Sequence, residues 1–225
     1  MKEIYGKEEI ILLSEYLGFK NEFKFKAFIY NFNDYWDITD EELSSDEIWF
    51  FYQEEVIKRF KEIQKNLGIG ENFSDLSLEE KFLAVIEITK KVGSQYLSKY
   101  FKGKIDENIA EKLVEYGYLH GSCDSLSSTL CSLFEEGQVK RFKVASFGHQ
   151  CVLLNGKYYD ITGCSTEEEM KAFVAKEGNT SINDCTIQEG LLLENRHKLI
   201  DRIVTRFVKT ILLNKEKNPP VAEDE

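Results

Sequence analysis

Residues 148–161 read GHQCVLLNGKYYDI. The pair Asn155-Gly156 lies between two apolar runs, which is the strongest short-range signal for a β-hairpin closed by a two-residue type I′ turn. With these two residues as the loop, the pairing runs back along both strands and sets Cys151 opposite Asp160. A shift of one residue would turn every side chain to the other face, and the turn chemistry opposes that shift. We therefore expect an antiparallel hairpin in this register.

The predicted register brings an imidazole and a carboxylate together. His149 lies two residues before Cys151, so both side chains point to one face of the sheet. His149 and Asp160 then become diagonal neighbours, with Cβ atoms roughly 5–8 Å apart and within side-chain reach. Thr162 shares this face. The hairpin alone can thus pair His149 with Asp160.

A cysteine begins the helix expected before this hairpin. Cys123, Leu126, Leu130 and Phe134 share one helical face, so Cys123 lies at the N-terminal end of the stripe that packs on the core. Unpaired amides and the positive end of the helix dipole stabilise a thiolate there. Gly121 leaves the backbone room to turn into the helix. We expect this helix to pack on the hairpin face that carries the imidazole and the carboxylate.

These three residues form a candidate thiol triad. Cys123 would be the nucleophile, His149 the base that takes its proton, and Asp160 the acid that orients the imidazole. Taken singly, each has a plainer interpretation: a helical cysteine on an apolar stripe usually belongs to the core, and an aspartate after a hairpin usually serves a turn. Their order and expected geometry together favour catalysis.

The same residues resemble the transglutaminase-like superfamily of papain-like thiol enzymes. The resemblance covers about residues 117–163, with a cysteine at a helix start (Cys123), a glycine after that helix (Gly137), a histidine opening a strand (His149) and an aspartate on the next strand (Asp160). It implies a papain-like core in which an antiparallel sheet packs on the cysteine-bearing helix. It also implies thioester chemistry on amides, namely peptide cleavage, deamidation, deglycosylation or acyl transfer.

The resemblance leaves the second oxyanion donor open. Papain has a glutamine six residues before its cysteine, and Gly117 stands at that position here. Tyr118 and His120 are candidate donors, and Cys151 is a candidate for lining the substrate site. Gln150 follows the histidine, where many members of the superfamily have an aromatic residue.

The rest of the chain predicts an α+β protein. Two capping boxes, Ser44 to Glu47 and Ser77 to Glu80, mark helix starts. Residues 21–35 suggest an extended or irregular aromatic segment. We expect helices over 8–16, 44–67, 77–101, 107–116, 123–136, 166–176 and 190–215, and strands over 139–147, 149–154 and 157–161. We divide the chain into a mainly helical part (1–106), a transglutaminase-like core with a C-terminal helix (107–215) and a disordered tail (216–225), or take it as a single domain overall.

Composition narrows the function classes. The 225 residues carry a net charge of −11, which disfavours nucleic acid as a partner. The first residues, MKEIYGK, lack the apolar core of a signal peptide, and no apolar run reaches the length of a membrane span. The five cysteines form no CxxC pair, so reduced thiols in a cytoplasmic protein are expected and zinc is the weaker interpretation. We expect Cys131, Cys151, Cys164 and Cys185 to be buried or partly buried.

The sequence therefore predicts a cysteine-dependent hydrolase or acyltransferase, most readily a peptidase or amidase, that acts on a peptide or protein amide without a cofactor or metal. Two alternatives remain: a binding or scaffold protein that keeps the fold without catalysis, and a metal-binding protein that uses the cysteines and histidines. The apolar stripe of the C-terminal helix most readily packs on the same chain, as in a monomer. A homodimer through that helix is the second possibility, and a helix lying on a membrane surface is disfavoured by the acidity of the chain.

Overall fold

A computed structural model describes residues 7–31, 73–193 and 199–213. Within these residues the protein is α+β, with seven α-helices and a five-stranded antiparallel sheet. The predicted helix over 44–67 and the predicted tail over 216–225 lie outside the described residues.

Most helices begin where the sequence predicted. Ser77 caps α5 and forms a capping box with Glu80. Thr166 caps α8 in the same way with Glu169. The helices are α1 (Lys7–Tyr16), α2 (Glu22–Asn31), α5 (Leu78–Tyr100), α6 (Glu107–His120), α7 (Cys123–Leu133), α8 (Glu167–Glu177) and α9 (Leu199–Phe207). Shorter turns follow the 3₁₀ pattern at Phe73–Asp75 and Ile182–Asp184 and the π pattern at Val208–Leu213.

The sheet is built around the predicted hairpin. Its strands are β1 (Gln138–Lys143), β2 (Gly148–Leu154), β3 (Lys157–Asp160), β4 (Gly163–Ser165) and β5 (Thr186–Glu189), in the order β4-β3-β2-β1-β5. Leu154 pairs with Lys157 and the two preceding pairs follow, so the predicted register is confirmed. Asn155 and Gly156 both have positive φ, 49° and 78°, as a type I′ turn requires.

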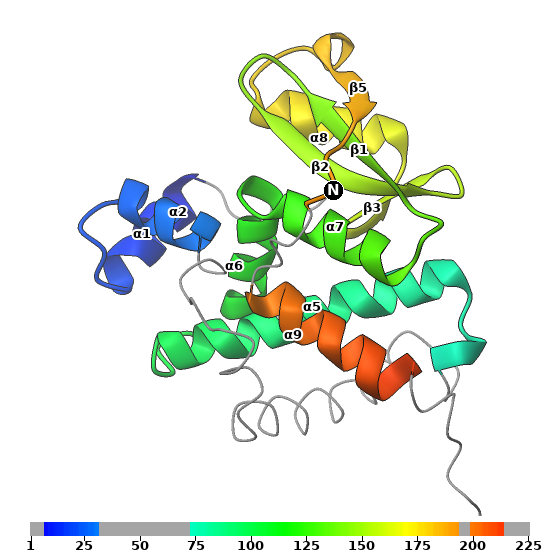
Figure 1. Ribbon diagram of the computed structural model, residues 1–225. Helices are drawn as coiled ribbons and strands as arrows, with labels where there is room; N and C mark the ends of the chain where they lie inside the picture. The colour runs from blue at the N-terminus through cyan, green and yellow to red at the C-terminus, as the bar shows by residue number, and fades with distance from the viewer. Residues whose placement is uncertain (1–6, 32–72, 194–198, 214–225) are drawn as a thin grey trace, which may run out of the picture.

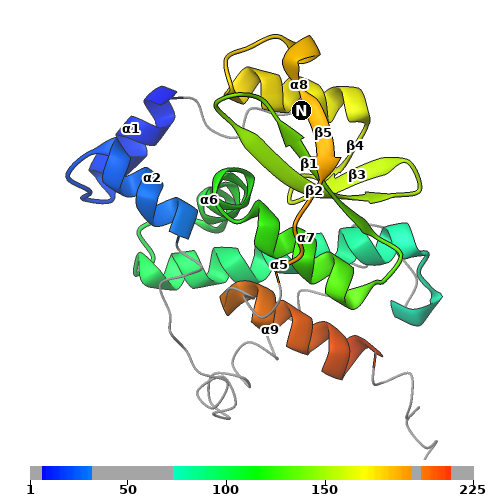
Figure 2. The ribbon, with the colours of Figure 1, turned by 45° about the horizontal axis from the view of Figure 1, so that its top comes forward.

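Helices cover both faces of the sheet. Figure 1 and Figure 2 show α7 between the sheet and the pair α5 and α9, while α8 lies on the opposite side of the sheet. One face of the hairpin meets α5 and α7, since the Tyr159 ring packs on Phe82 with centroids 5.3 Å apart. The other face meets α8, where the Tyr158 hydroxyl donates to Glu167.

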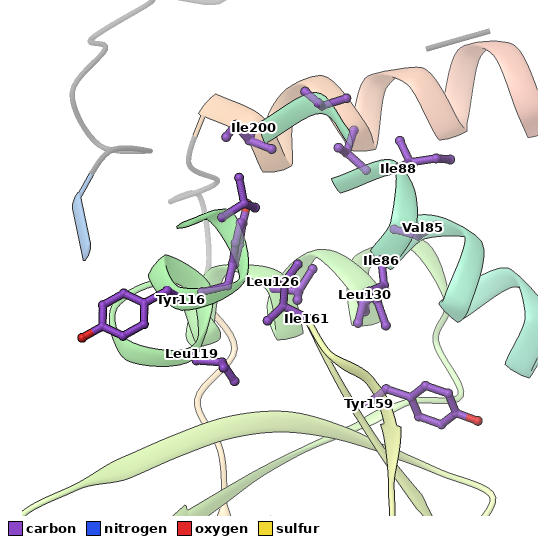
Figure 3. Packing of buried hydrophobic residues seen from close by; sticks show 14 of the residues in the cluster. Val85, Ile86, Ile88, Tyr116, Leu119, Leu126, Leu130, Tyr159, Ile161 and Ile200 are labelled. Atoms are coloured by element: carbon purple, nitrogen blue, oxygen red, sulfur yellow. The ribbon is translucent and has the colours of Figure 1, made fainter. Parts of the chain in front are cut away.

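The apolar core continues across residue 106, the boundary predicted between two parts. Figure 3 shows Leu126 and Leu130 of α7 close to Ile86 of α5 and to Ile161, which follows β3. One cluster of buried side chains runs from Ile10 in α1 to Leu212 near the end of the described chain. The two-part division of the chain stays a prediction.

The prediction of an extended aromatic segment over 21–35 was wrong in its described portion, where α2 is helical. Asn21 explains the helix start, because its side-chain oxygen accepts a hydrogen bond from the Lys24 amide at 2.9 Å. Phe25, Phe28 and Ile29 fall at i, i+3 and i+4, and all three are buried. The aromatic residues follow the helical period once the cap is recognised.

Two predicted helix ends were also wrong. The α-helical part of α7 stops at Leu133 rather than at residue 136, because Phe134 turns extended and buries its ring against Phe82, with centroids 5.2 Å apart. In the other direction, α6 continues past the predicted end at Tyr116 to His120. The burial of Tyr118 and Leu119 outweighs the helix-breaking tendency of Gly117, which costs about 1 kcal/mol.

The region after α8 differs most from the prediction. Residues 190–193 were predicted to be helical, but they are irregular and follow β5, a strand that the sequence did not predict. The short strand β4 was missed as well. Its Cys164 is exposed, because β4 is an edge strand, so the prediction that this cysteine is covered was wrong; the predictions for Cys131, Cys151 and Cys185 are confirmed.

None of the described helices has a window long and apolar enough to cross a bilayer. The predicted apolar stripe of α9 packs on the same chain: Ile200, Ile203, Val204 and Phe207 are buried.

Candidate active site

His149 and Asp160 form a buried pair, as the hairpin register predicts. His149 Nε2 lies 2.8 Å from Asp160 Oδ2, and both side chains are almost fully buried. The second carboxylate oxygen of Asp160 accepts two bonds from Thr162, from the backbone amide at 2.8 Å and from the hydroxyl at 2.6 Å. Asp160 is thus held on both oxygens, which orients the carboxylate toward the ring.

Cys123 completes the group at the N-terminus of α7. The residue is partly exposed, and its thiol lies close enough to the His149 side chain and to the backbone amide of Gln150 for both to lower its pKa. Because Asp160 occupies Nε2, Nδ1 is the ring atom left to share with the thiol. The other neighbour of Nδ1 is the Leu119 carbonyl oxygen, 3.2 Å away. The structure therefore brings together all three residues of the predicted triad.

The helix reaches His149 by a different route from the one predicted. α7 packs on the opposite face of the hairpin, where Gln150 Nε2 donates to Ser127 Oγ at 2.7 Å. The His149 face is covered by α8 instead, with the Phe173 ring perpendicular to the imidazole at a centroid distance of 5.3 Å. Cys123 meets the imidazole at the edge of β2, beyond the end of β3.

The hairpin register explains why an amide is available at this edge. Main-chain groups along a strand point alternately to its two sides, and Leu154 pairs with Lys157 across the turn. Every second residue of β2 before Leu154 therefore points its main-chain groups toward β3. Gln150 is four residues before Leu154, so its amide also points to that side. Because β3 ends at Asp160, the Gln150 amide extends past the last strand residue and donates to the Cys123 sulfur.

The electrostatics favour a thiolate–imidazolium pair. Burial acts to raise the pKa of Cys123, but the His149 hydrogen bond and charge, together with the Gln150 amide, outweigh burial and hold the pKa below its ordinary value. Burial acts to lower the pKa of His149, yet the bonds to Asp160 and Cys123 raise it to about 10. The geometry agrees, since the Asp160 carboxylate and the Leu119 carbonyl can only accept, so each bond needs a protonated ring nitrogen.

The first turn of α7 has no side-chain cap from its N-cap residue on its backbone amides. Its N-cap residue, Ser122, makes no side-chain capping bond; its hydroxyl points instead to the Tyr30 carbonyl oxygen at 3.5 Å. Helix geometry leaves the amides of Cys123 and Asp124 without acceptors inside the helix. These amides are suited to hold negative charge on an oxygen beside the thiol.

Tyr118, a predicted oxyanion donor, lies in a separate buried network. Its hydroxyl donates to Asp201 Oδ1 at 2.9 Å, and the Ser125 hydroxyl donates to Asp201 Oδ2 at 2.5 Å. Asp201 lies in α9 and is fully buried. The network ties the C-terminal helix to the first turn of α7, two residues after Cys123.

The other two candidate site residues, His120 and Cys151, also pack within the fold. His120 stacks on Tyr30 and packs against Phe147, and its pKa is lowered to about 4 by burial and by the charge of His149, so the ring is neutral at pH 7. Cys151 is fully buried and donates to the Lys140 carbonyl oxygen. Burial and the charges of Asp160 and Cys123 raise the pKa of the Cys151 thiol.

Sequence reasoning missed three residues near the triad and the hydrogen-bonding role of a fourth. Two left no recognisable local signal: Phe173 packs on the imidazole from α8, and the Leu119 carbonyl reaches it only because α6 is longer than predicted. Thr162 was placed on the correct face, but its bonds to the carboxylate were not predicted; a hydroxyl two residues after an aspartate is typical of such turns. Asp201 could have been found as a carboxylate within an apolar helical stripe, which requires a partner.

Gly121 is explained by crowding rather than by the sharp turn that the sequence suggested. Its φ is −143°, which other residues adopt. A Cβ atom there would lie 2.5 Å from the Tyr30 carbonyl oxygen and 2.8 Å from the Tyr30 Cα. The glycine therefore permits α2 to pass directly over the junction between α6 and α7.

We expect Gly121→Ala to destabilise the fold by about 1–3 kcal/mol, because the close atoms are backbone and cannot rotate away. Urea unfolding followed by circular dichroism measures the change. Ser132→Ala, at an exposed position on α7, is the matched control and should stay within about 0.5 kcal/mol of the unaltered chain. Equal unfolding midpoints for Gly121→Ala and Ser132→Ala would contradict the close approach of Tyr30.

Comparison of the whole chain with family models, with curated proteins and with solved structures finds no match. Among residues 7–31, 73–193 and 199–213, no three or more His, Cys, Asp or Glu side chains are grouped so as to hold a metal ion.

Proposed function

We propose that this protein is a cysteine-dependent hydrolase or acyltransferase that acts on amide bonds through a thioester, most readily as a peptidase or amidase with a transglutaminase-like core. The observation that carries the proposal is the approach of Cys123, a partly exposed residue at the start of α7, to the buried pair His149 and Asp160. A cysteine of the core alone would require neither a buried imidazole nor a carboxylate behind it.

The proposed reaction begins with attack of the Cys123 thiolate on the carbonyl carbon of an amide. The carbonyl electrons move to oxygen, and the first amides of α7 stabilise the resulting oxyanion. When the tetrahedral intermediate collapses, the C–N bond breaks and the His149 imidazolium gives its proton to the leaving amine. The acyl group stays on sulfur as a thioester.

Water or a second amine then attacks the thioester. Neutral His149 takes a proton from that nucleophile, the C–S bond breaks, and the thiolate–imidazolium pair returns. Water releases a carboxylic acid, whereas an amine releases a new amide. Asp160 keeps the ring oriented and stabilises its charge throughout.

The test is formation of an acyl-enzyme from an activated ester. We expect p-nitrophenyl acetate to give one acetyl group on Cys123, seen by intact mass and peptide mapping, together with a burst of nitrophenol followed by slower turnover. Cys123→Ala should lose both signals. Cys164→Ala, which removes an exposed cysteine on β4, is the matched control and should keep them.

An unacylated Cys123, or equal acylation of Cys123 and the exposed Cys164, would contradict the proposal. The chain would then be better described as a binding or scaffold protein. Incubation of a peptide library with the unaltered protein and with Cys123→Ala identifies the amide that is cleaved or transferred.

A further inference from the structure

We propose that residues 190–193 form an apolar wall beside Cys123, on which a peptide substrate places a large apolar side chain. This inference rests on the proposed function. Two adjacent leucines carry it: Leu191 is 68% exposed and Leu192 is 60% exposed.

The backbone of this segment is pinned although it is neither helix nor strand. The Gly190 amide donates to the Val139 carbonyl oxygen at 2.9 Å. The Leu191 amide donates to Gln150 Oε1 at 3.0 Å, and Gln150 Nε2 donates back to the Leu191 carbonyl oxygen at 2.9 Å. The Gln150 side chain thus binds both the amide and the carbonyl of Leu191, as a residue of a neighbouring strand would.

A further bond fixes the far end of the segment. The Leu193 amide donates to Ser128 Oγ at 3.0 Å, on α7. At the near end, a Cβ on Gly190 would lie 2.3 Å from a methyl carbon of Val139, so the glycine lets the segment lie directly on the sheet. The leucines are therefore presented by a fixed backbone.

Gln150 also places this segment next to the nucleophile. Its backbone amide donates to the Cys123 sulfur, while its side chain reaches Ser127 and Leu191. Ser127 is four residues after Cys123, about one helical turn or 6 Å along α7. Figure 2 shows the chain after β5 running down beside α7.

Two exposed leucines on a fixed backbone can bury their apolar surface against an apolar group of a ligand. Single exposed leucines are common and need no explanation, but two adjacent ones on a pinned segment offer contact area without the cost of ordering a loop. Because Gln150 links the segment that carries these leucines to Cys123, the occupant that fits is the substrate itself: an extended peptide whose carbonyl lies at Cys123 and whose neighbouring side chain is leucine-sized and uncharged. Apolar contact of this kind gives only a modest difference in rate between substrates.

Paired peptide electrophiles test the wall. The probes are two acetyl-X-glycine chloromethyl ketones in which X is leucine or serine; each forms an S–C bond with Cys123 and releases chloride. We expect the leucine probe to label Cys123 about tenfold faster than the serine probe, as for partial burial of one leucine side chain. The double variant Leu191→Ser with Leu192→Ser should bring the two rates together.

Leu12→Ser is the matched control, because Leu12 lies on α1 and is 66% exposed, much like Leu191. This variant should keep the tenfold preference. Iodoacetamide, which carries no peptide, should label Cys123 at the same rate in all three proteins and so reports an intact site.

The outcomes separate the two proposals. Fast iodoacetamide labelling of Cys123 with equal rates for the two probes, or with a preference that survives the double serine variant, overturns the apolar wall and leaves the proposed function standing. Iodoacetamide labelling no faster than that of an ordinary thiol overturns the proposed function, and the apolar wall fails with it.

Discussion

Replacing His149 with alanine should slow alkylation of Cys123 by iodoacetamide at pH 7 by about ten- to a hundredfold, because each unit of rise in the thiol pKa lowers the thiolate fraction about tenfold. The imidazole supplies the two strongest influences that favour the Cys123 thiolate, a hydrogen bond and a positive charge. Without them, only the Gln150 amide opposes burial and the Asp124 charge, both of which raise the pKa of the thiol.

The pH dependence of the Cys123 labelling rate should show that the thiol pKa is lowered. The pKa of Cys123 lies below its ordinary value of 9.0, so the labelling rate should stay high as the pH falls below 9 and drop only when the thiolate itself is protonated. On the alkaline side, the imidazolium loses its proton near pH 10, and the ion pair is lost there. In His149→Ala the rising limb should move to higher pH.

Peptide mapping with mass spectrometry measures these rates residue by residue. Cys131 is the internal comparison, since burial raises its pKa to about 11 and it should label slowly at pH 7 in both proteins. Asp160→Asn is the graded variant, because it removes the negative charge behind the imidazole but keeps a group of the same shape. Superimposable pH profiles for the unaltered protein and His149→Ala would rule out the ion pair.

Asp201→Ala should lower the free energy of unfolding by about 2–6 kcal/mol, since it removes the acceptor of two buried hydrogen bonds and the loss of an acceptor costs each buried donor about 1–3 kcal/mol. The donors are Tyr118 and Ser125, so the change loosens α6 and α7 from α9 at once. Urea unfolding measures the loss. Asp201→Asn keeps one carbonyl acceptor and should lose about half as much.

Asp184→Ala is the matched control for this variant. Asp184 also accepts a bond from a hydroxyl, that of Thr180 at 2.7 Å, but both residues are exposed. Its replacement should cost no more than about 0.5 kcal/mol, as is usual for surface positions. If Asp201→Ala and Asp184→Ala unfolded at the same urea concentration, the buried network would contribute nothing to stability.

The hairpin was predictable because its determinants are local. Asn155 and Gly156 accept positive φ, and a two-residue turn leaves one register for the strands on either side. That register alone places His149 beside Asp160. The N-terminal position of Cys123 was equally local, since Cys123, Leu126 and Leu130 share one helical face.

The errors occur where distant segments meet. α2 is helical although its aromatic residues suggested otherwise, because the Asn21 cap was not recognised. Residues 190–193 are held out of a helix by Gln150 and Ser128, which lie far away in the sequence. The exposure of Cys164 follows from its place on an edge strand, which becomes known only when the strand order is known.

The candidate site likewise has some features set by local sequence and others set by tertiary packing. Short-range chemistry, in a turn and at a helix start, was enough to select Cys123, His149 and Asp160 and to pair the last two. Only tertiary packing decided which face of the hairpin the helix covers, which amide reaches the sulfur, and how Asp201 and the exposed leucines lie about α7. The physical reason is range: a turn restricts a few dihedral angles, whereas helix docking depends on side chains brought together from the whole chain.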